Sequence, residues 1–245
     1  MKSKILLILT TAGRLHWLKN ATASLRDPLD VLVVDDATPK EVGIGDFCKE
    51  HEFHFITKSK PKGLTDTWNI GYRFFKEKGY TYCILSNDDV RFPDGFSRGL
   101  IRALNTRCHL VGPITNASGN ALHQWVRRFV RSPKWSYPED FKNFDRVQET
   151  LIKQYKDVPL QPCDFVNGFC FAFSIAIFQF AFSPTCLFDP KNTNVDAELD
   201  LAQRVRSKGG NIVVCRTSYV YHQKMGTYRE LGWKKIFGQR NRLWR

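Results

Sequence analysis

A short apolar stretch, Tyr82–Leu85, runs through Ser86 into an amide and two adjacent carboxylates, Asn87, Asp88 and Asp89. An apolar run of this length is typical of a strand that helices cover on both faces. Proteins of the α/β class bind their ligands beyond the carboxyl ends of such strands. Oxygen donors suit Mg²⁺ or Mn²⁺, which takes one or two protein carboxylates when phosphates fill its other positions. The stretch therefore predicts a metal–diphosphate site, with a simple turn as the alternative, because aspartate is common in turns.

The pattern of a strand followed by a helix recurs along the first half of the chain. We expect strands at 5–9, 31–34, 53–56, 80–85 and 109–113. We expect helices at 15–25, 64–79 and 96–104, the second with Leu64, Trp68, Tyr72 and Phe75 on one face. This alternation predicts an α/β fold with a mainly parallel central sheet and helices on both faces.

The pattern is lost between residues 116 and 161, where only 144–155 is helix-like. A long irregular segment inside a compact domain is usually a functional loop. The alternative is a disordered excursion, which the aromatic content of the segment disfavours.

Order is expected to return at 163–173, an apolar strand interrupted by a glycine, a residue that lets a sugar or phosphate approach the backbone. A helix is expected at 193–208, with Thr193 and Asp196 as its capping box. Last strands are expected at 212–215 and 219–221. The basic tail is residues 224–245. Its last part, Trp233–Arg245, alternates cations with aromatic and aliphatic residues, which predicts either a membrane-surface helix or a helix packed on the domain.

The bulk composition fits one globular domain. The chain has 245 residues, 42% of them hydrophobic, which is enough to bury one sizeable core. Its apolar start is short, so it reads as a first strand and not as a signal peptide. Seven scattered cysteines without a Cys-Xaa-Xaa-Cys spacing predict reduced thiols and a cytoplasmic location. The net charge of +13 favours polyanionic partners such as nucleotide phosphates, anionic lipids or nucleic acid.

Together these features resemble the inverting glycosyltransferases of family 2, which have the GT-A fold, and especially their rhamnosyltransferase-like branch. Seven elements carry the resemblance in the family's order: Thr10–Arg14, Val34–Thr38, Lys62–Gly71, Leu85–Val90, Val166–Gly168, Asp196–Leu201 and Tyr219–His222. The resemblance covers residues 4–223. It implies one GT-A domain, residues 1–245, with a nucleotide-sugar half (1–115), an acceptor-side insertion (116–161), a catalytic half (162–223) and the basic tail.

The resemblance also implies roles for single residues. It places ligands for Mn²⁺ or Mg²⁺ at Asp89 and His222, and a general base at Glu198 with Asp196 as the competing candidate. Donor binding is implied for Thr10, Thr11, Arg14, Asp35, Asp36, Lys62, Gly63, Asn69, Asn87, Asp88 and Gly168. Acceptor contacts are expected at Trp125, Trp135 and Asn167. The implied partners are a nucleotide-sugar donor, with UDP as the expected nucleotide, and a glycan or glycoconjugate acceptor.

One departure from the family concerns Trp68, which stands where many members carry an arginine that meets the diphosphate. Another cation is then expected there, from Lys62, Lys224 or Arg229.

Several of the implied roles have structural alternatives. Asp35 fits a turn, His222 a packed core position, and Asp200 an exposed ion pair with Arg204. Asp89 is expected to be exposed at its strand tip. Glu198 lies near a helix N-terminus, which predicts a lowered pKa.

Two other functions compete with sugar transfer. A sugar-1-phosphate nucleotidyltransferase needs a Gly-rich basic loop after the first strand, which Thr10–Arg14 lacks. A nucleic-acid-binding module is suggested by charge alone, and no zinc-finger, RNP or helix-turn-helix signature supports it. No nucleic acid partner is therefore expected, and membrane contact is expected only through the tail.

Overall fold

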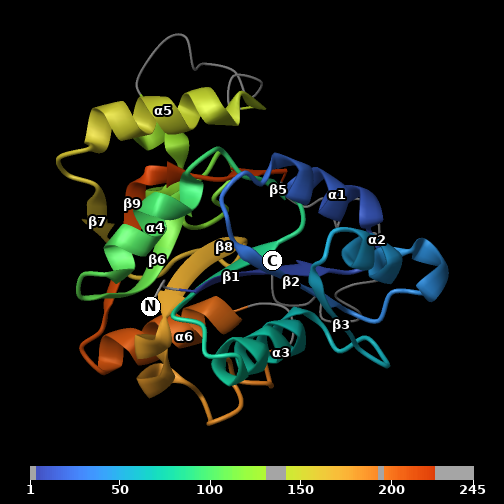
Figure 1. Cartoon of the computed structure of the whole chain (residues 1–245). Helices are drawn as coiled ribbons and strands as arrows, with labels where there is room; N and C mark the ends of the chain where they lie inside the picture. The colour runs from blue at the N-terminus through green and yellow to red at the C-terminus, as the bar shows by residue number, and fades with distance from the viewer. Residues whose placement is uncertain (1–3, 131–141, 193–195, 224–245) are drawn as a thin grey trace, which may run out of the picture.

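The computed structural model describes residues 4–130, 142–192 and 196–223. Its centre is an eight-stranded mixed sheet with the order β3-β2-β1-β4-β8-β6-β9-β7 (Figure 1). The strands of this sheet are β1 (Ile5–Thr11), β2 (Asp30–Asp35), β3 (His54–Thr57), β4 (Tyr82–Asn87), β6 (Cys108–Ile114), β7 (Leu160–Pro162), β8 (Cys170–Ser174) and β9 (Asn211–Tyr219). A separate pair joins β5 (Val90–Arg91) to β10 (Tyr221–His222). The helices are α1 (Leu15–Ser24), α2 (Ile44–Glu50), α3 (Leu64–Glu77), α4 (Phe96–Leu104), α5 (Phe144–Tyr155) and α6 (Ala197–Ser207).

Four neighbouring strands, β3, β2, β1 and β4, run parallel, as do β6 and β9. β8 runs antiparallel between β4 and β6. Thr11 pairs with Asp35, and Thr10 pairs with Asn87, so the polar ends of β1, β2 and β4 form one edge. The predicted α/β fold with a mainly parallel sheet is confirmed. None of the described helices is long and apolar enough to cross a membrane.

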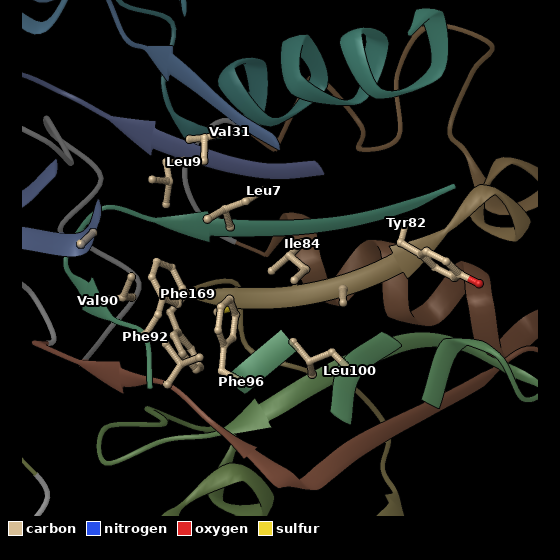
Figure 2. Packing of buried hydrophobic residues seen from close by; sticks show 14 of the residues in the cluster. Leu7, Leu9, Val31, Tyr82, Ile84, Val90, Phe92, Phe96, Leu100 and Phe169 are labelled. Atoms are coloured by element: carbon tan, nitrogen blue, oxygen red, sulfur yellow. The ribbon is translucent and has the colours of Figure 1, made fainter. Parts of the chain in front are cut away.

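Alternating residues of each strand supply two apolar layers. Leu7 and Leu9 of β1 belong to the layer under α1, α2 and α4, part of which Figure 2 shows. Leu6 and Ile8 belong to the layer under α3 and α6. In Figure 1 the same helices lie on opposite sides of the sheet. Each fully buried aliphatic side chain contributes about 1.5–3 kcal/mol, so the two layers fix the register of the strands and the position of their polar ends.

Two predicted strand assignments are wrong, and one helix was missed. The strand expected at 163–173 begins only at Cys170, because Asn167 bonds to the Gln124 side chain and to the Ser118 carbonyl instead of to a neighbouring strand. The strands expected at 212–215 and 219–221 are one strand, β9, which continues past a register shift against β6 and is followed by the short β10. Helix α2 was not predicted, since its seven residues make only two turns.

The segment predicted to be irregular, 116–161, is well packed where it is described. Short 3₁₀ helices at Leu122–Gln124 and Val126–Arg128 lead toward α5, which lies against β9. These elements and the sheet share a third apolar cluster: Ile114, Val126, Phe129, Val130, Val147, Leu151, Val214 and Tyr219. The disordered alternative is therefore wrong for the described part. Trp135, Thr193 and the tail with Lys224 and Arg229 lie outside the described residues.

Candidate active site

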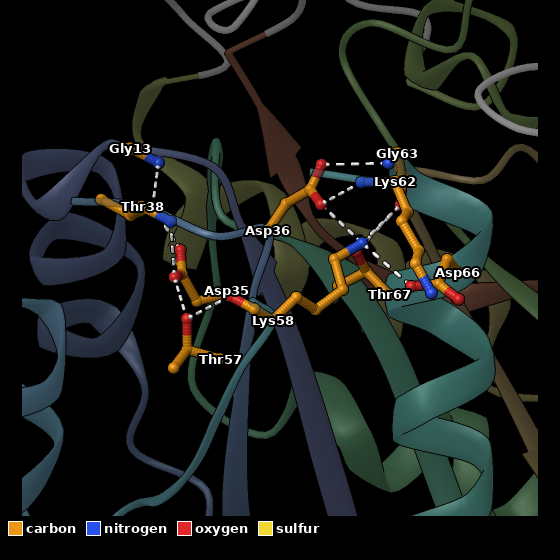
Figure 3. A network of polar contacts seen from close by, with 10 residues as sticks. All are labelled: Gly13, Asp35, Asp36, Thr38, Thr57, Lys58, Lys62, Gly63, Asp66 and Thr67. Carbon is orange, nitrogen blue, oxygen red and sulfur yellow. Dashed lines mark hydrogen bonds and ion pairs between the residues drawn. The ribbon is translucent and has the colours of Figure 1, made fainter. Parts of the chain in front are cut away.

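Asp35 ends β2 and shapes the turn that follows it (Figure 3). Its buried carboxylate accepts hydrogen bonds from the amide and hydroxyl of Thr38 and from the hydroxyl of Thr57, the first and last at 2.8 Å. Both carboxylate oxygens are thus engaged within the protein. This geometry favours the turn-shaping alternative for Asp35 over contact with a nucleotide.

Asp36 is joined to the loop of the predicted donor residues Lys62 and Gly63, and to Lys58, which sequence reasoning did not single out. Its carboxylate accepts the amide hydrogens of Lys62 (3.0 Å) and Gly63 (3.2 Å) and forms an ion pair with Lys58 Nζ at 2.5 Å. Lys58 Nζ also donates to Gly63 O and to the Thr67 hydroxyl, as the dashed lines in Figure 3 show. The Lys62 side chain is exposed, whereas that of Lys58 is 5% exposed. Lys58 is one of three lysines in five residues, and nothing in the sequence distinguishes it from Lys60 and Lys62.

The two predicted metal ligands are brought together by the β5–β10 ladder, in which Val90 pairs with His222. Asp89 Oδ1 lies 3.5 Å from His222 Nε2. His222 is held from the other side, because its Nδ1 lies 3.0 Å from Ala117 O and its backbone exchanges two hydrogen bonds with the Asn116 side chain. Asp89 is only 4% exposed, so the expectation of an exposed ligand is wrong. The ladder covers the strand tip that a lone β4 would leave open.

Asp88 lies beside this pair and is also buried. Burial raises the pKa of its carboxyl to about 7, and the negative charge of Asp89 adds to the effect. The Thr11 side chain and the Arg14 guanidinium act in the opposite direction. Two carboxylates crowded in this way favour a bound cation, because its charge would lower their pKa values.

Thr10 and Asn87 lie next to each other at the same edge. The Thr10 hydroxyl lies 3.4 Å from Asn87 Oδ1. The backbone N–H of Asn87 donates to Phe169 O at 2.9 Å. Asn69, in contrast, is turned inward. Its side chain exchanges two 3.0 Å hydrogen bonds with the backbone of Phe188, so the structure gives it a structural role.

Three consecutive residues, 167–169, join the separate parts of the site. The Asn167 amide donates to Gln124 Oε1 at 2.7 Å, which ties the loop to the acceptor-side insertion. Gly168 lies against the Glu198 carboxyl group, since a Cβ at this position would be 3.2 Å from Glu198 Cδ. Phe169 stacks on the His222 ring, with centroids 4.8 Å apart and 14° between the planes. Gln124 was not predicted, because a glutamine in an irregular segment carries no motif.

Glu198 lies in the first turn of α6, as expected, but its pKa is raised, not lowered. Burial is the main cause and the charge of Asp196 adds to it, while the amides of Glu198 and Gly168 work against them. The predicted lowering is wrong because burial outweighs the helix terminus.

The structure also shows what the two neighbouring carboxylates, Asp196 and Asp200, contact. Asp196 is exposed, has a φ of 64°, and makes no side-chain capping bond, so the predicted capping role of its side chain is wrong. Asp200 pairs with Arg204 at 2.8 Å, as predicted, although the pair is partly buried and not exposed.

Comparison with known proteins agrees with this geometry. The sequence model of the family described as Glycosyl transferase family 2 matches residues 7–179, more than half of the chain. The chain belongs to glycosyltransferase family 2. A solved structure of GalNAc-T7 with UDP, GalNAc and Mn²⁺ is similar over 90% of this chain, with a TM-score of 0.65 and 13% sequence identity. This chain spans 44% of the length of that one. A comparison with curated proteins gave no match.

The glycosyltransferase therefore has the GT-A fold that its sequence implied. The region matched by the family model includes Asp36, Asp89 and Gly168 and ends before Glu198 and His222. The link of Glu198 and His222 to the site is therefore supported by their contacts with the 167–169 loop and not by the family match.

In the segment predicted to contact the acceptor, Trp125 is half-buried and forms a β-bridge with Thr115, just after β6. The Arg127 guanidinium lies over its ring, 5.8 Å from the centroid. Asn167 faces the same segment, with its Nδ2 3.3 Å from Ser118 O.

Proposed function

We propose that this protein is a metal-dependent, inverting glycosyltransferase that moves a sugar from a nucleoside-diphosphate donor, expected to be UDP-linked, to a hydroxyl of a glycan or glycoconjugate. One observation carries the proposal: residues 167–169 contact the acceptor-side insertion, Glu198 and His222 in succession. Transfer needs an acceptor, a base and a stabilised leaving group to meet at one sugar, and this loop joins the three corresponding parts. The UDP and Mn²⁺ bound by GalNAc-T7 support the same assignment by analogy of fold.

The donor site is assigned to the polar edge of β1, β2 and β4. Thr10 and Thr11 end the first strand and Arg14 follows it, and the loop carrying Gly63 is held over this edge by Asp36. Backbone amides and buried polar side chains of this kind suit a nucleoside diphosphate.

The residues present fit a divalent cation. Ala117 O can only accept a hydrogen bond, so the hydrogen of a neutral His222 lies on Nδ1 and its Nε2 presents a lone pair to Asp89 Oδ1. A cation between Asp89 Oδ1 and His222 Nε2, which lie 3.5 Å apart, would accept a lone pair from each. In the described part of the chain no group of three or more His, Cys, Asp or Glu side chains is arranged to hold a metal. Asp89 and His222 would therefore be its protein ligands, with diphosphate oxygens as the others. Such a cation neutralises the charge that develops on the departing diphosphate.

Glu198 is assigned as the general base. Its carboxylate takes the proton of the acceptor hydroxyl while the hydroxyl oxygen bonds to the anomeric carbon and the nucleoside diphosphate leaves from the opposite face. A raised pKa makes the carboxylate a stronger base than one in water. Asp196 stays the competing candidate; its exposure makes it second.

The acceptor is assigned to Trp125, Asn167 and the insertion, with Trp135 as a further predicted contact outside the described residues. Membrane-surface binding by the tail and a cytoplasmic location remain predictions.

A panel of UDP-, GDP- and dTDP-sugars with and without Mn²⁺ tests the proposal. We expect one donor class to be hydrolysed slowly and to raise the melting temperature only with the cation. Glu198→Gln should cut transfer by a factor on the order of 10² or more while nucleotide binding persists. Asp196→Asn should be milder. Loss of transfer in Asp196→Asn with a nearly normal Glu198→Gln, both folded, would move the base to Asp196.

A further inference from the structure

Trp68 is a buried residue of α3 on the side of the sheet that carries Glu198. It is 2% exposed, and its ring packs against Phe188 (centroids 4.9 Å apart) and edge-on against Phe171 (5.9 Å). Its indole N–H is buried and finds no hydrogen-bond partner among the described residues. An unpaired buried donor disfavours folding. Such a departure calls for an explanation, and functional sites are where departures of this kind are expected.

The ring and the Glu198 carboxyl group pack on the same backbone atom. A Cβ added to Gly168 would lie 2.7 Å from Trp68 Cη2 and 3.2 Å from Glu198 Cδ. The far end of the indole therefore reaches the loop that supports the carboxylate. A phenyl ring at position 68 would be too short to make this contact.

We infer that Trp68 is a positioning residue for Glu198: its indole supports Gly168, on which the carboxylate rests, and keeps water away from that carboxylate. The inference rests on the proposed role of Glu198 as general base. Burial is the main cause of the raised pKa of Glu198. An apolar side chain that excludes water from a carboxylate has this effect. Within the described residues, the charged group acting on Glu198 is Asp196, which precedes α6, while α3 presents the Trp68 ring and the 167–169 loop presents the Gly168 amide.

The first test compares pH–rate profiles. Trp68→Phe keeps an aromatic side chain and removes the contact with Gly168. We expect the acid limb of kcat to move to lower pH by on the order of half a unit, because water reaches the carboxylate. We expect kcat to fall about tenfold with donor KM changed less than about threefold, since a small misplacement of a catalytic group affects the chemical step.

Phe173→Leu is the matched control. Phe173 belongs to the same apolar layer and packs on Phe75, away from Gly168. It should lower the melting temperature without moving the acid limb. An acid limb that moves equally in both variants would overturn the inference, because a general loosening of the core would then explain it.

The second test does not use activity. Because the folded-state pKa of Glu198 lies above its ordinary value of 4.5, stability linked to this group is present at low pH and is lost as pH rises through the folded pKa. The stability difference between Glu198 and Glu198→Gln proteins, followed against pH, reports that pKa. We expect its midpoint to lie lower in the Trp68→Phe background. Should Trp68→Phe not fold, Trp68→Tyr is measured in the same way.

The two tests separate the claims. If the midpoint of the stability difference moves in Trp68→Phe while the acid limb of kcat stays fixed, Trp68 supports Glu198 but Glu198 is not the base. A midpoint that does not move overturns the inference whatever the kinetics show.

Discussion

Replacing Lys58 by methionine is the perturbation whose size the structure defines best. Methionine keeps most of the side-chain length and removes the charge. Lys58 is 5% exposed, and Asp36, its nearest carboxylate partner, is 16% exposed. Breaking a buried ion pair costs about 3–5 kcal/mol, because the remaining charge is left uncompensated. We expect about 3 kcal/mol, since Asp36 keeps two backbone hydrogen bonds and some solvent contact. Asp66, at 3.2 Å but 33% exposed, adds little.

The measurement is thermal unfolding. For a protein of this size, 3 kcal/mol corresponds to a fall of about 6–12 °C in melting temperature. Lys62→Met is the matched control in the same loop; its exposed side chain should change stability by less than about 0.5 kcal/mol. The double variant Lys58→Met with Asp36→Asn should recover part of the loss, because it also removes the stranded charge.

A shift below about 2 °C in Lys58→Met, or a control shift as large as that of the variant, would refute this reasoning. It would mean that Asp36 is solvated well enough to need no partner, and that the loop over the polar edge is held by its backbone bonds alone.

Four further outcomes follow from the site. Gly168→Ala should lower stability by about 1–3 kcal/mol in thermal unfolding, because its Cβ would lie 2.7 Å from Trp68, and should abolish transfer. Asp89→Asn should remove the Mn²⁺-dependent stabilisation by nucleotide while preserving the volume of this buried side chain. Wild-type transfer should rise with pH through a pKa above the ordinary 4.5 of glutamate, and Glu198→Gln should melt no lower than wild type at pH 7, since burial disfavours the charged form. Trp125→Ala should raise acceptor KM and leave donor hydrolysis unchanged; the reverse pattern would make the insertion a donor lid.

Apolar runs and helical spacing in the sequence predicted the central strands and the buried face of α3. Continuous apolar runs located β1, β2 and β4, because strands covered on both faces are made mainly of apolar residues. The face of α3 with Trp68, Tyr72 and Phe75 was predicted from helical spacing and is buried as expected. The end of β9 was missed because pairing with β6 extends it beyond its apolar run.

The parts of the site that were missed depend on pairing between distant segments. Gln124 joins Pro113 O to the Asn167 amide, and Lys58 is selected from three lysines only because Asp36 faces it. A sequence shows that a lysine or glutamine is present, but the partner that gives it a role comes from the tertiary fold. The same holds for Asp89, whose burial is due to a ladder with a strand more than a hundred residues away.

The pKa of Glu198 shows why the local argument failed where it did. A helix N-terminus stabilises a nearby carboxylate by about 0.3–1 kcal/mol, which is less than one pKa unit. Burial shifts a carboxyl pKa by up to several units in the other direction. The local term is visible in the sequence of α6, whereas burial depends on the tertiary fold, which brings Gly168 against the carboxyl group from an element far away in the chain. The larger effect is therefore the one that the sequence does not show, and for the proposed reaction it has the useful sign, since a carboxylate with a raised pKa accepts a proton from a sugar hydroxyl more readily.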